Sequence, residues 1–233
     1  MMLEDALSAL KTHIEPERIE AMASYHKQSR VVLGVANGPL NDLTKLWRQD
    51  LTLAERVALA DALWQSDIFE ARIAAGKLLT QSRIKDDDAA WDLLQSWVAD
   101  FDSWAIADQA CSAIGKRLIA TPDRLDTVES WTGSDHIWTQ RAALVATLPW
   151  AKLPNPKPAD DDARTRILSW AAGYVTDRNW FIQKAIAWWL RDLSKHDAAR
   201  VQEFLATYGA QMKPFAQKEA AKYLTASDQT PTS

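Results

Sequence analysis

Trp104 and Asp108 are the residues whose types and spacing in this chain best suit chemistry. They lie four positions apart in a stretch of helical periodicity, so both side chains project from one face of the same helix. An indole face attracts a cation through its quadrupole, and a neighbouring carboxylate attracts the same cation by charge. The pair therefore predicts a site that recognises a positively charged group.

Two further tryptophans lie close to basic residues. Trp188 follows Lys184 by four positions, and Trp138 precedes Arg141 by three. Most tryptophans of a helical protein belong to the core. Trp104 and Trp188 share a helix face with charged groups, so for these two a functional role and a core role are equally consistent with the sequence. We expect seven of the twelve tryptophans to be buried in the core, namely Trp47, Trp64, Trp91, Trp97, Trp131, Trp150 and Trp170.

The common catalytic patterns are missing. The sequence has no phosphate-binding Gly-rich loop, no H-E-x-x-H, no G-x-S-x-G and no C-x-x-C. Its one cysteine, Cys111, is expected to be a small core residue, and four scattered histidines make a metal site unexpected. We therefore expect neither a metal nor a cofactor, and any chemistry falls to carboxylate and aromatic side chains.

The composition is that of an ordinary globular protein. The 233 residues are 47% hydrophobic and 25% charged, and no apolar run approaches a membrane span or a signal peptide, so we expect a cytoplasmic protein. The net charge of −4 argues against general coating of nucleic acid but leaves room for a local basic groove. The acidic runs at 86–88 and 160–162 are expected to lie on the outside.

The elements that position these residues are helices. Helical periodicity runs through residues 2–12, 16–27, 53–64, 68–82, 87–100, 104–119, 136–149, 162–176, 179–194, 198–208 and 214–224. Thr52, Ser103 and Asp135 are typical residues for helix starts. No alternating strand is found, and the Pro-rich stretch 149–158 reads as a loop. The sequence therefore predicts an all-α fold with a disordered tail at 226–233.

A repeated pattern connects several of these helices. Phe69, Trp138, Phe181 and Phe215 each precede a cation by three residues, and alanines follow in every copy. With Asp108 placed in the series of Arg72, Arg141, Lys184 and Lys218, the steps are 36, 33, 43 and 34 residues. This matches two-helix units of roughly 34–47 residues, the period of HEAT-like solenoids. We predict a single right-handed solenoid domain over residues 1–225.

Equivalent positions of a solenoid stack along one face, so the four cations are expected to form a row on a concave surface. Such a row suits a phosphate backbone, where charge supplies most of the affinity that does not depend on sequence. The simpler interpretation is that these cations are solvated on the helix surfaces. If the row forms, Asp108 stands in it as a single carboxylate among cations, which would hold it ionised and directed at whatever the row binds.

Three segments resemble one known family. Trp104 with Asp108, the stretch Ile137–Ala143 around Arg141, and the stretch Phe181–Arg191 with Lys184 and Trp188 are similar to segments of the AlkD-type DNA alkylation repair proteins. That family consists of HEAT-like-repeat glycosylases, which remove N3- and N7-alkylated purines from DNA. The resemblance runs from the region of Tyr25 to Lys218, although the glycine expected before the second tryptophan is Ala187.

The resemblance implies a role for each matched residue. Asp108 would be the catalytic carboxylate, Trp104 and Trp188 would flank the lesion and its sugar, and Arg141 and Tyr25 would contact DNA. It also implies a monomer that binds alkylated double-stranded DNA, associated with the nucleoid when bound. Lys184, Arg72 and Lys218 are further candidates for phosphate contacts, and we do not expect Lys184 to act as a Schiff-base nucleophile.

Two alternatives remain at this stage. A non-catalytic member of the same superfamily would bind bent, branched or damaged DNA through the same groove. A protein-interaction scaffold, the commonest use of α-solenoids, fits the acidic net charge but leaves Trp104, Asp108, Arg141 and Trp188 without a purpose.

Overall fold

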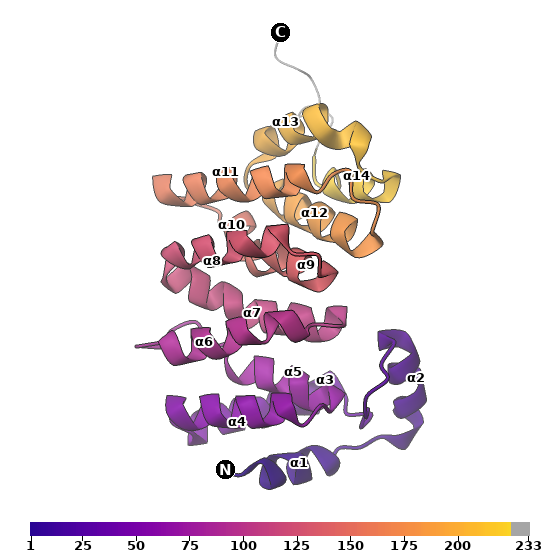
Figure 1. Ribbon diagram of the computed structural model, residues 1–233, viewed down its shortest axis with the longest axis vertical. Coiled ribbons are helices and arrows are strands. Elements are labelled where there is room, and N and C mark those ends of the chain that lie inside the picture. The colour runs from indigo at the N-terminus through magenta and orange to yellow at the C-terminus, as the bar shows by residue number, and fades with distance from the viewer. Residues whose placement is uncertain (225–233) are drawn as a thin grey trace. The chain divides into compact units, whose positions relative to one another are not determined.

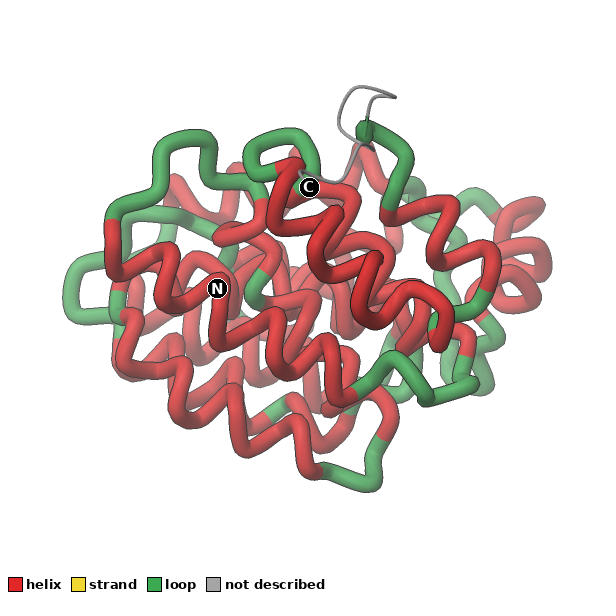
Figure 2. The backbone as a smooth tube through the Cα atoms, turned by 90° about the horizontal axis from the view of Figure 1, so that it is seen from above, coloured by secondary structure: helices red, strands yellow, loops and turns green. Residues whose placement is uncertain are grey.

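The computed structural model describes residues 1–224. These residues form helices joined by loops (Figure 2), and within them the one β contact is an isolated bridge between Val31 and Ile68. The prediction of an all-α fold is confirmed. The tail predicted at 226–233 lies outside the described residues.

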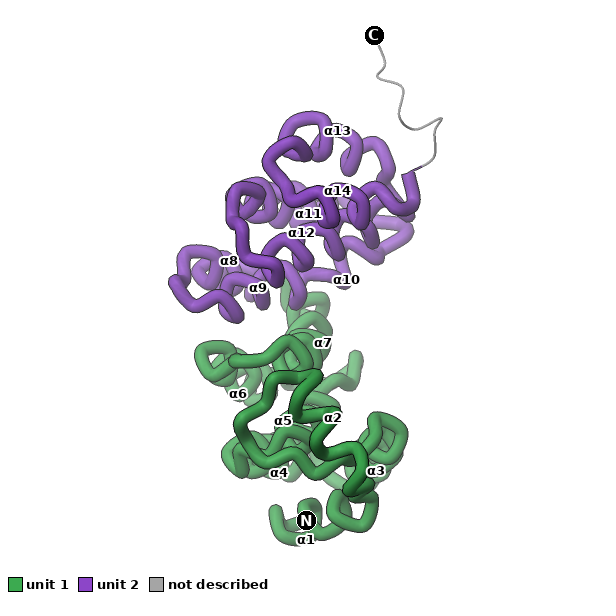
Figure 3. Tube along the Cα trace, turned by 90° about the vertical axis from the view of Figure 1, so that its right-hand side faces the viewer, with its two compact units in different colours: residues 1–122 green, residues 123–233 purple. Residues whose placement is uncertain are grey.

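The chain divides into two compact units, Met1–Pro122 and Asp123–Ser233 (Figure 3). Each unit is described by itself below. The single domain over 1–225, its right-handed twist and its concave groove remain predictions.

The first unit holds seven α-helices, which are α1 (Leu3–Lys11), α2 (Pro16–His26), α3 (Asn37–Asp50), α4 (Leu53–Gln65), α5 (Phe69–Leu78), α6 (Asp88–Ser96) and α7 (Trp104–Ala120). Helix α5 is central, because it packs against α3, α4 and α7. In Figure 1, α4 and α6 lie in front of the layer that contains α5 and α7. Gly76 allows α5 and α7 to approach closely, since a Cβ at this position would lie 3.1 Å from Cγ of Gln109.

The second unit holds the other helices, α8 (Leu125–Ser130), α9 (Ile137–Ala146), α10 (Leu148–Ala151), α11 (Pro158–Gly173), α12 (Trp180–Leu193), α13 (Ala198–Tyr208) and α14 (Pro214–Ala220). Helix α12 occupies the central position here and packs against α9, α10, α13 and α14. The central helix of each unit, α5 or α12, contains alanines and follows another helix, α4 or α11, in the chain.

Indole rings are the largest side chains of the core. All seven tryptophans predicted to be core are buried, and so is Cys111. Trp64 and Trp97 stack with ring centroids 4.3 Å apart and planes 2° from parallel. Large flat side chains fill the space between helix pairs that small alanines leave open.

Some helix boundaries differ from those predicted. Helix α3 is missing from the predicted helical segments, and it contains Gly38 and Pro39, which are turn residues in most contexts. Both fall in the first turn of α3, where a proline removes no intrahelical hydrogen bond. The stretch 149–158 is not one loop either, since Pro149 lies inside the short helix α10 and Pro158 begins α11.

The acidic run 86–88 was expected on the outside, but part of it is buried. Asp87 is buried and forms an ion pair with Arg117, which is itself fully buried, at 2.9 Å between oxygen and Nη1. Arg117 Nη2 also donates to the carbonyls of Gln81 and Ser82. The pair therefore fixes the loop between α5 and α6 to α7, and this carboxylate contributes little to the surface charge.

Candidate active site

A cluster of four rings lies where α2 ends and where α5 and α7 begin. The His26 imidazole is between Phe69 and Trp104, with ring centroids 4.8 and 5.0 Å away. The Tyr25 ring is nearly perpendicular to the rings of His26 and Trp104, with centroids 4.8 and 5.8 Å away. Phe69 and Trp104 are the first residues of their helices, so the repeated aromatic position brings them to the same end of the unit.

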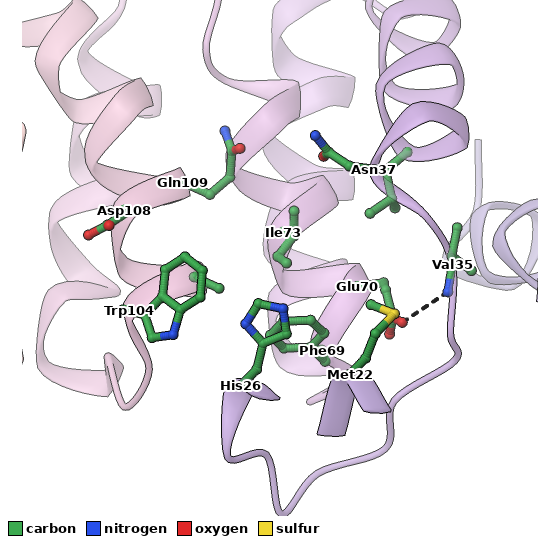
Figure 4. Close-up of a pocket in the computed structure, with 12 residues that line it drawn as sticks. Met22, His26, Val35, Asn37, Phe69, Glu70, Ile73, Trp104, Asp108 and Gln109 are labelled. Atoms are coloured by element: carbon green, nitrogen blue, oxygen red, sulfur yellow. Dashed lines mark hydrogen bonds between the residues drawn. The ribbon is translucent and has the colours of Figure 1, made fainter. Parts of the chain in front are cut away.

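Three of these rings, those of His26, Phe69 and Trp104, form one wall of a cavity of about 370 Å³ within the first unit. Trp104 and Asp108 both line it from α7, one turn apart as their spacing predicted, and Gln109 follows on the same helix. In Figure 4 the carboxyl group of Asp108 points away from the other labelled side chains. Asn37 of α3 and Ile73 of α5 form another part of the lining. The cavity therefore combines an aromatic wall, two acidic residues (Glu70 and Asp108) and neutral amides.

The position of His26 and Tyr25 depends on the segment that follows α2. The buried carboxylate of Glu70 accepts hydrogen bonds from the backbone N–H groups of Leu33, Gly34 and Val35, at 2.9, 2.7 and 3.1 Å. Gly34 has a φ of +79°, and a Cβ there would lie 2.5 Å from the Glu15 carbonyl oxygen. The segment is therefore held to α5 through its backbone.

Arg30 makes a second attachment of the same segment. Its guanidinium pairs with Asp67, just before α5, at 2.9 Å, and with Asp102, just before α7. One side chain thus connects the segment after α2 to the starts of both helices that carry the aromatic wall. The rings meet because these starts are fixed together.

Arg72 is engaged within the first unit. Its guanidinium lies 4.7 Å above the Trp64 ring, its Nε donates to the Trp64 carbonyl at 3.2 Å, and its Nη2 pairs with Asp67 at 3.1 Å. These contacts give Arg72 a structural part in holding α4 to α5. Its predicted contact with phosphate is not tested by them.

In the second unit, Arg141 is 3% exposed and donates from Nη1 to the carbonyl of Phe181 at 2.8 Å. The Trp138 and Phe181 rings are 4.7 Å apart, and Trp180 stacks on Phe215 at 5.7 Å. Two aromatic positions of the predicted repeat, Trp138 and Phe181, thus meet at the starts of α9 and α12, and Trp180 connects Phe181 to the third, Phe215 of α14.

Trp188 is half-buried, and its Nε1 donates to Asp192 at 3.0 Å. Lys152 lies 5.7 Å above the Trp188 ring, so this indole face already has a cation beside it. Lys184 pairs with Glu219 at 3.5 Å, while Lys218 is exposed. The second-unit candidates therefore differ in setting, from a buried guanidinium to an exposed ammonium.

His26, Phe69 and Glu70 were not singled out from the sequence as site residues. The aromatic repeat contains Phe69, but its meaning as a cavity wall needs the contact with His26, 43 positions earlier. Glu70 follows Phe69 in the first turn of a helix, where carboxylates are common for reasons of the helix dipole alone.

Burial lowers the pKa of the His26 imidazole from 6.5. The folded protein therefore binds this proton less readily than the unfolded chain, and the stability present above pH 6.5 is lost as the pH falls below it. We expect His26→Phe to lose less unfolding free energy than the wild type between about pH 7 and pH 5. Urea unfolding at both pH values measures this, with His13→Gln as an exposed control. Equal losses in the wild type and His26→Phe would contradict it.

The fold and the cavity define an all-helical repeat protein whose candidate site joins aromatic rings to a carboxylate. The model of the DNA alkylation repair enzyme family matches residues 6–224. The chain belongs to this family, which supports a role in DNA repair and DNA as a partner. No curated protein was found to match the chain.

Solved structures share the fold. A protein of Enterococcus faecalis, described as a predicted DNA alkylation repair enzyme, is 23% identical with a TM-score of 0.76, over 92% of this chain and 98% of that one. The protein smu.31 from Streptococcus mutans UA159 is 19% identical with a TM-score of 0.61, over 81% and 92% of the two chains. AlkD2 from Streptococcus mutans is 18% identical with a TM-score of 0.58, over 97% and 100%.

Within residues 1–224 no helix is long and apolar enough to cross a membrane. Over the same part of the chain, no three His, Cys, Asp or Glu side chains are grouped so that they would hold a metal ion.

Proposed function

We propose that this protein is a DNA glycosylase that hydrolyses the N-glycosidic bond of N3- and N7-alkylated purines in duplex DNA. One observation carries the proposal: Trp104 and Asp108, one helical turn apart on α7, both line the cavity of the first unit. In a chain of the DNA alkylation repair enzyme family, this pair suits a cationic nucleotide.

The chemistry requires little from the protein beyond electrostatics. A purine alkylated at N3 or N7 is already positively charged, so its glycosidic bond breaks without protonation of the base. The electron pair of that bond leaves with the base, which departs neutral, and positive charge develops on the sugar. Asp108 stabilises this oxocarbenium-like sugar by charge.

Water completes the reaction. Its oxygen forms a bond to C1′ of the sugar, and its proton passes to Asp108 or to solvent. Asp108 thus both stabilises the cation and orients the nucleophile. No lysine nucleophile is required, so we expect free base and an abasic site as the products, without strand cleavage.

Selection of charged lesions follows from the aromatic wall. The face of an indole attracts a cation by about 0.5–2 kcal/mol, depending on desolvation. Trp104 therefore favours a cationic purine over a normal one, and no pocket shaped for one base is needed. The reaction can proceed with little or no base flipping.

Tyr25 is the best placed of the candidates for DNA contact, because it is 70% exposed beside the cavity wall. On the resemblance we also assign Arg141 to phosphate contact and Trp188 to the lesion nucleotide. We also assign Lys184, Lys218 and Arg72 to phosphate contact, and separate substitution of each residue tests its contribution to DNA binding.

The test is release of free 7-methylguanine and 3-methyladenine from methylated duplex DNA. We expect release by the wild type above the rate without enzyme. Absence of release, with binding to the same duplex intact, would replace the glycosylase by a non-catalytic DNA-binding protein. Absence of both at low salt would leave a protein-interaction scaffold.

Substitution of Trp104 tests the aromatic wall. We expect Trp104→Leu to lower kcat/KM for 7-methylguanine release by about 2–30-fold, the loss of one cation–π contact, and Trp104→Phe to lose less. Single-turnover release rates measure the effect. Binding to undamaged duplex serves as the control and should not change. A Trp104→Leu protein as active as the wild type would contradict the assignment.

A further inference from the structure

Three basic side chains of the first unit gather around the C-terminal end of α5. Arg48 of α3 donates from Nη1 to the Lys77 carbonyl at 2.6 Å, and Lys77 donates from Nζ to Asn41 Oδ1 at 2.7 Å. Arg56 of α4 donates from Nη1 to Gln81 Oε1 at 2.5 Å. All these acceptors are neutral. In the part of the chain that the structure describes, no carboxylate forms an ion pair with any of the three cations.

Two of these cations are buried, with Arg56 8% and Lys77 9% exposed. Arg56 Nε is buried without a hydrogen-bond partner. Burial, and then the charge of Arg48, lower the pKa of both Lys77 and Arg56. A protein normally pairs buried charges, because an unpaired one lowers the stability of the fold. The cluster therefore lacks a negative group.

The cluster continues the wall of the candidate active site. Lys77 lies one turn beyond Ile73 on α5, and Asn41 lies one turn beyond Asn37 on α3. Ile73 and Asn37 both line the cavity. A group bound at Lys77 would thus lie one or two helical turns, about 5–11 Å, from the cavity wall. At an axial rise of about 3.4 Å per nucleotide, this corresponds to two or three nucleotides along one strand.

We propose that Arg48, Arg56 and Lys77 bind a phosphate group, supplied by the backbone of the DNA strand whose nucleotide occupies the cavity. Guanidinium and ammonium groups are the usual phosphate donors, and Asn41 and Gln81 are exposed, so the cluster opens to solvent. Capping of the α5 carbonyls explains Arg48 alone. It does not explain two buried cations without a counter-charge. The DNA source rests on the proposed function, whereas the phosphate site does not.

The site is tested without DNA by thermal unfolding in inorganic phosphate, against chloride of equal ionic strength. We expect phosphate at about ten times its Kd to raise the wild-type Tm by roughly 3–5 °C. Lys77→Met should lose this rise yet melt no lower than the wild type in chloride, because it removes a buried, repelled charge. Lys45→Met, an exposed change on α3, should keep the rise.

Asn41→Asp gives a second variant that conserves shape. Its carboxylate would supply the missing charge to Lys77, so we expect a higher Tm in chloride and no further rise in phosphate. An equal phosphate response in the wild type, Lys77→Met and Asn41→Asp would overturn the site. The site would also be overturned if Lys77→Met melted below the wild type and phosphate raised the Tm of neither protein. That result is the behaviour of a purely structural lysine.

Binding to an undamaged duplex at several salt concentrations identifies the source of the phosphate. We expect Lys77→Met to reduce the slope of log K against log salt by about 0.9, the loss of one phosphate contact. A phosphate response without this change would overturn the DNA source and leave free phosphate as the ligand. Base release by the wild type is measured separately, so failure of the glycosylase proposal is distinguished from failure of this one.

Discussion

Asp108→Asn is expected to abolish most release of 7-methylguanine and 3-methyladenine, by about 10²–10³-fold or more in single-turnover rate. The substitution keeps the shape of the side chain and removes its charge. If the carboxylate stabilises the sugar cation, the loss falls on the chemical step and spares DNA binding. Release rates and Kd for the same methylated duplex, measured together, separate the two effects.

Asp92→Asn is the matched control, since Asp92 is an exposed carboxylate on α6 outside the cavity. It should release base at the wild-type rate. Equal rates for the wild type and Asp108→Asn would keep the enzyme but reject the carboxylate mechanism. Loss of DNA binding in Asp108→Asn would instead show that Asp108 organises the surface.

The parts of the site that the sequence predicted are those set by local spacing. Trp104 and Asp108 share a helix face because they are four residues apart, and the structure places both at one cavity. The core tryptophans were predictable for a different reason, since most tryptophans of a helical protein belong to the core. Helix geometry alone is sufficient for such pairs.

The rest of the site depends on contacts between segments far apart in the chain. Residues 26, 69 and 104 supply the ring stack, and no periodicity within one helix relates them. The segment between α2 and α3 was read as neither helix nor strand, and its backbone is satisfied by side chains such as Glu70. A single sequence does not reveal which distant donors a buried carboxylate will accept.

A glutamine directly precedes three of the four repeated cations, Arg141, Lys184 and Lys218, and two of these glutamines have a structural role. Gln183 donates from Nε2 to the carbonyls of Val175 and Asp177 and accepts from the Lys213 N–H at 2.8 Å. Gln217 Nε2 donates to the Met212 carbonyl at 3.2 Å. In α12 and α14 these glutamines therefore fix the loop before the helix, so the repeat marks how loops are held as well as where cations lie.

Glu70→Gln is expected to lower the free energy of unfolding by about 2–4 kcal/mol. The fully buried carboxylate accepts three backbone N–H groups, of Leu33, Gly34 and Val35. An amide has one acceptor oxygen, which can keep the two bonds that Oε1 now makes. Its NH₂ group would face the Leu33 N–H, so one buried donor is left unsatisfied and the other two lose the contribution of the charge. Urea unfolding measures the loss.

Glu17→Gln, an exposed first-turn carboxylate of α2, is the control and should cost less than about 1 kcal/mol. Hydrogen exchange distinguishes a local anchor from general destabilisation. Relative to the wild type, Glu70→Gln should increase the exchange rate of the amides of residues 33–35 more than that of the amides of α12, which lies in the other unit. Unchanged protection of these amides would mean that the segment after α2 is held mainly by Arg30. Loss of protection together with slower base release would show that this carboxylate, which also lines the cavity, maintains the ring stack that His26 makes with Trp104.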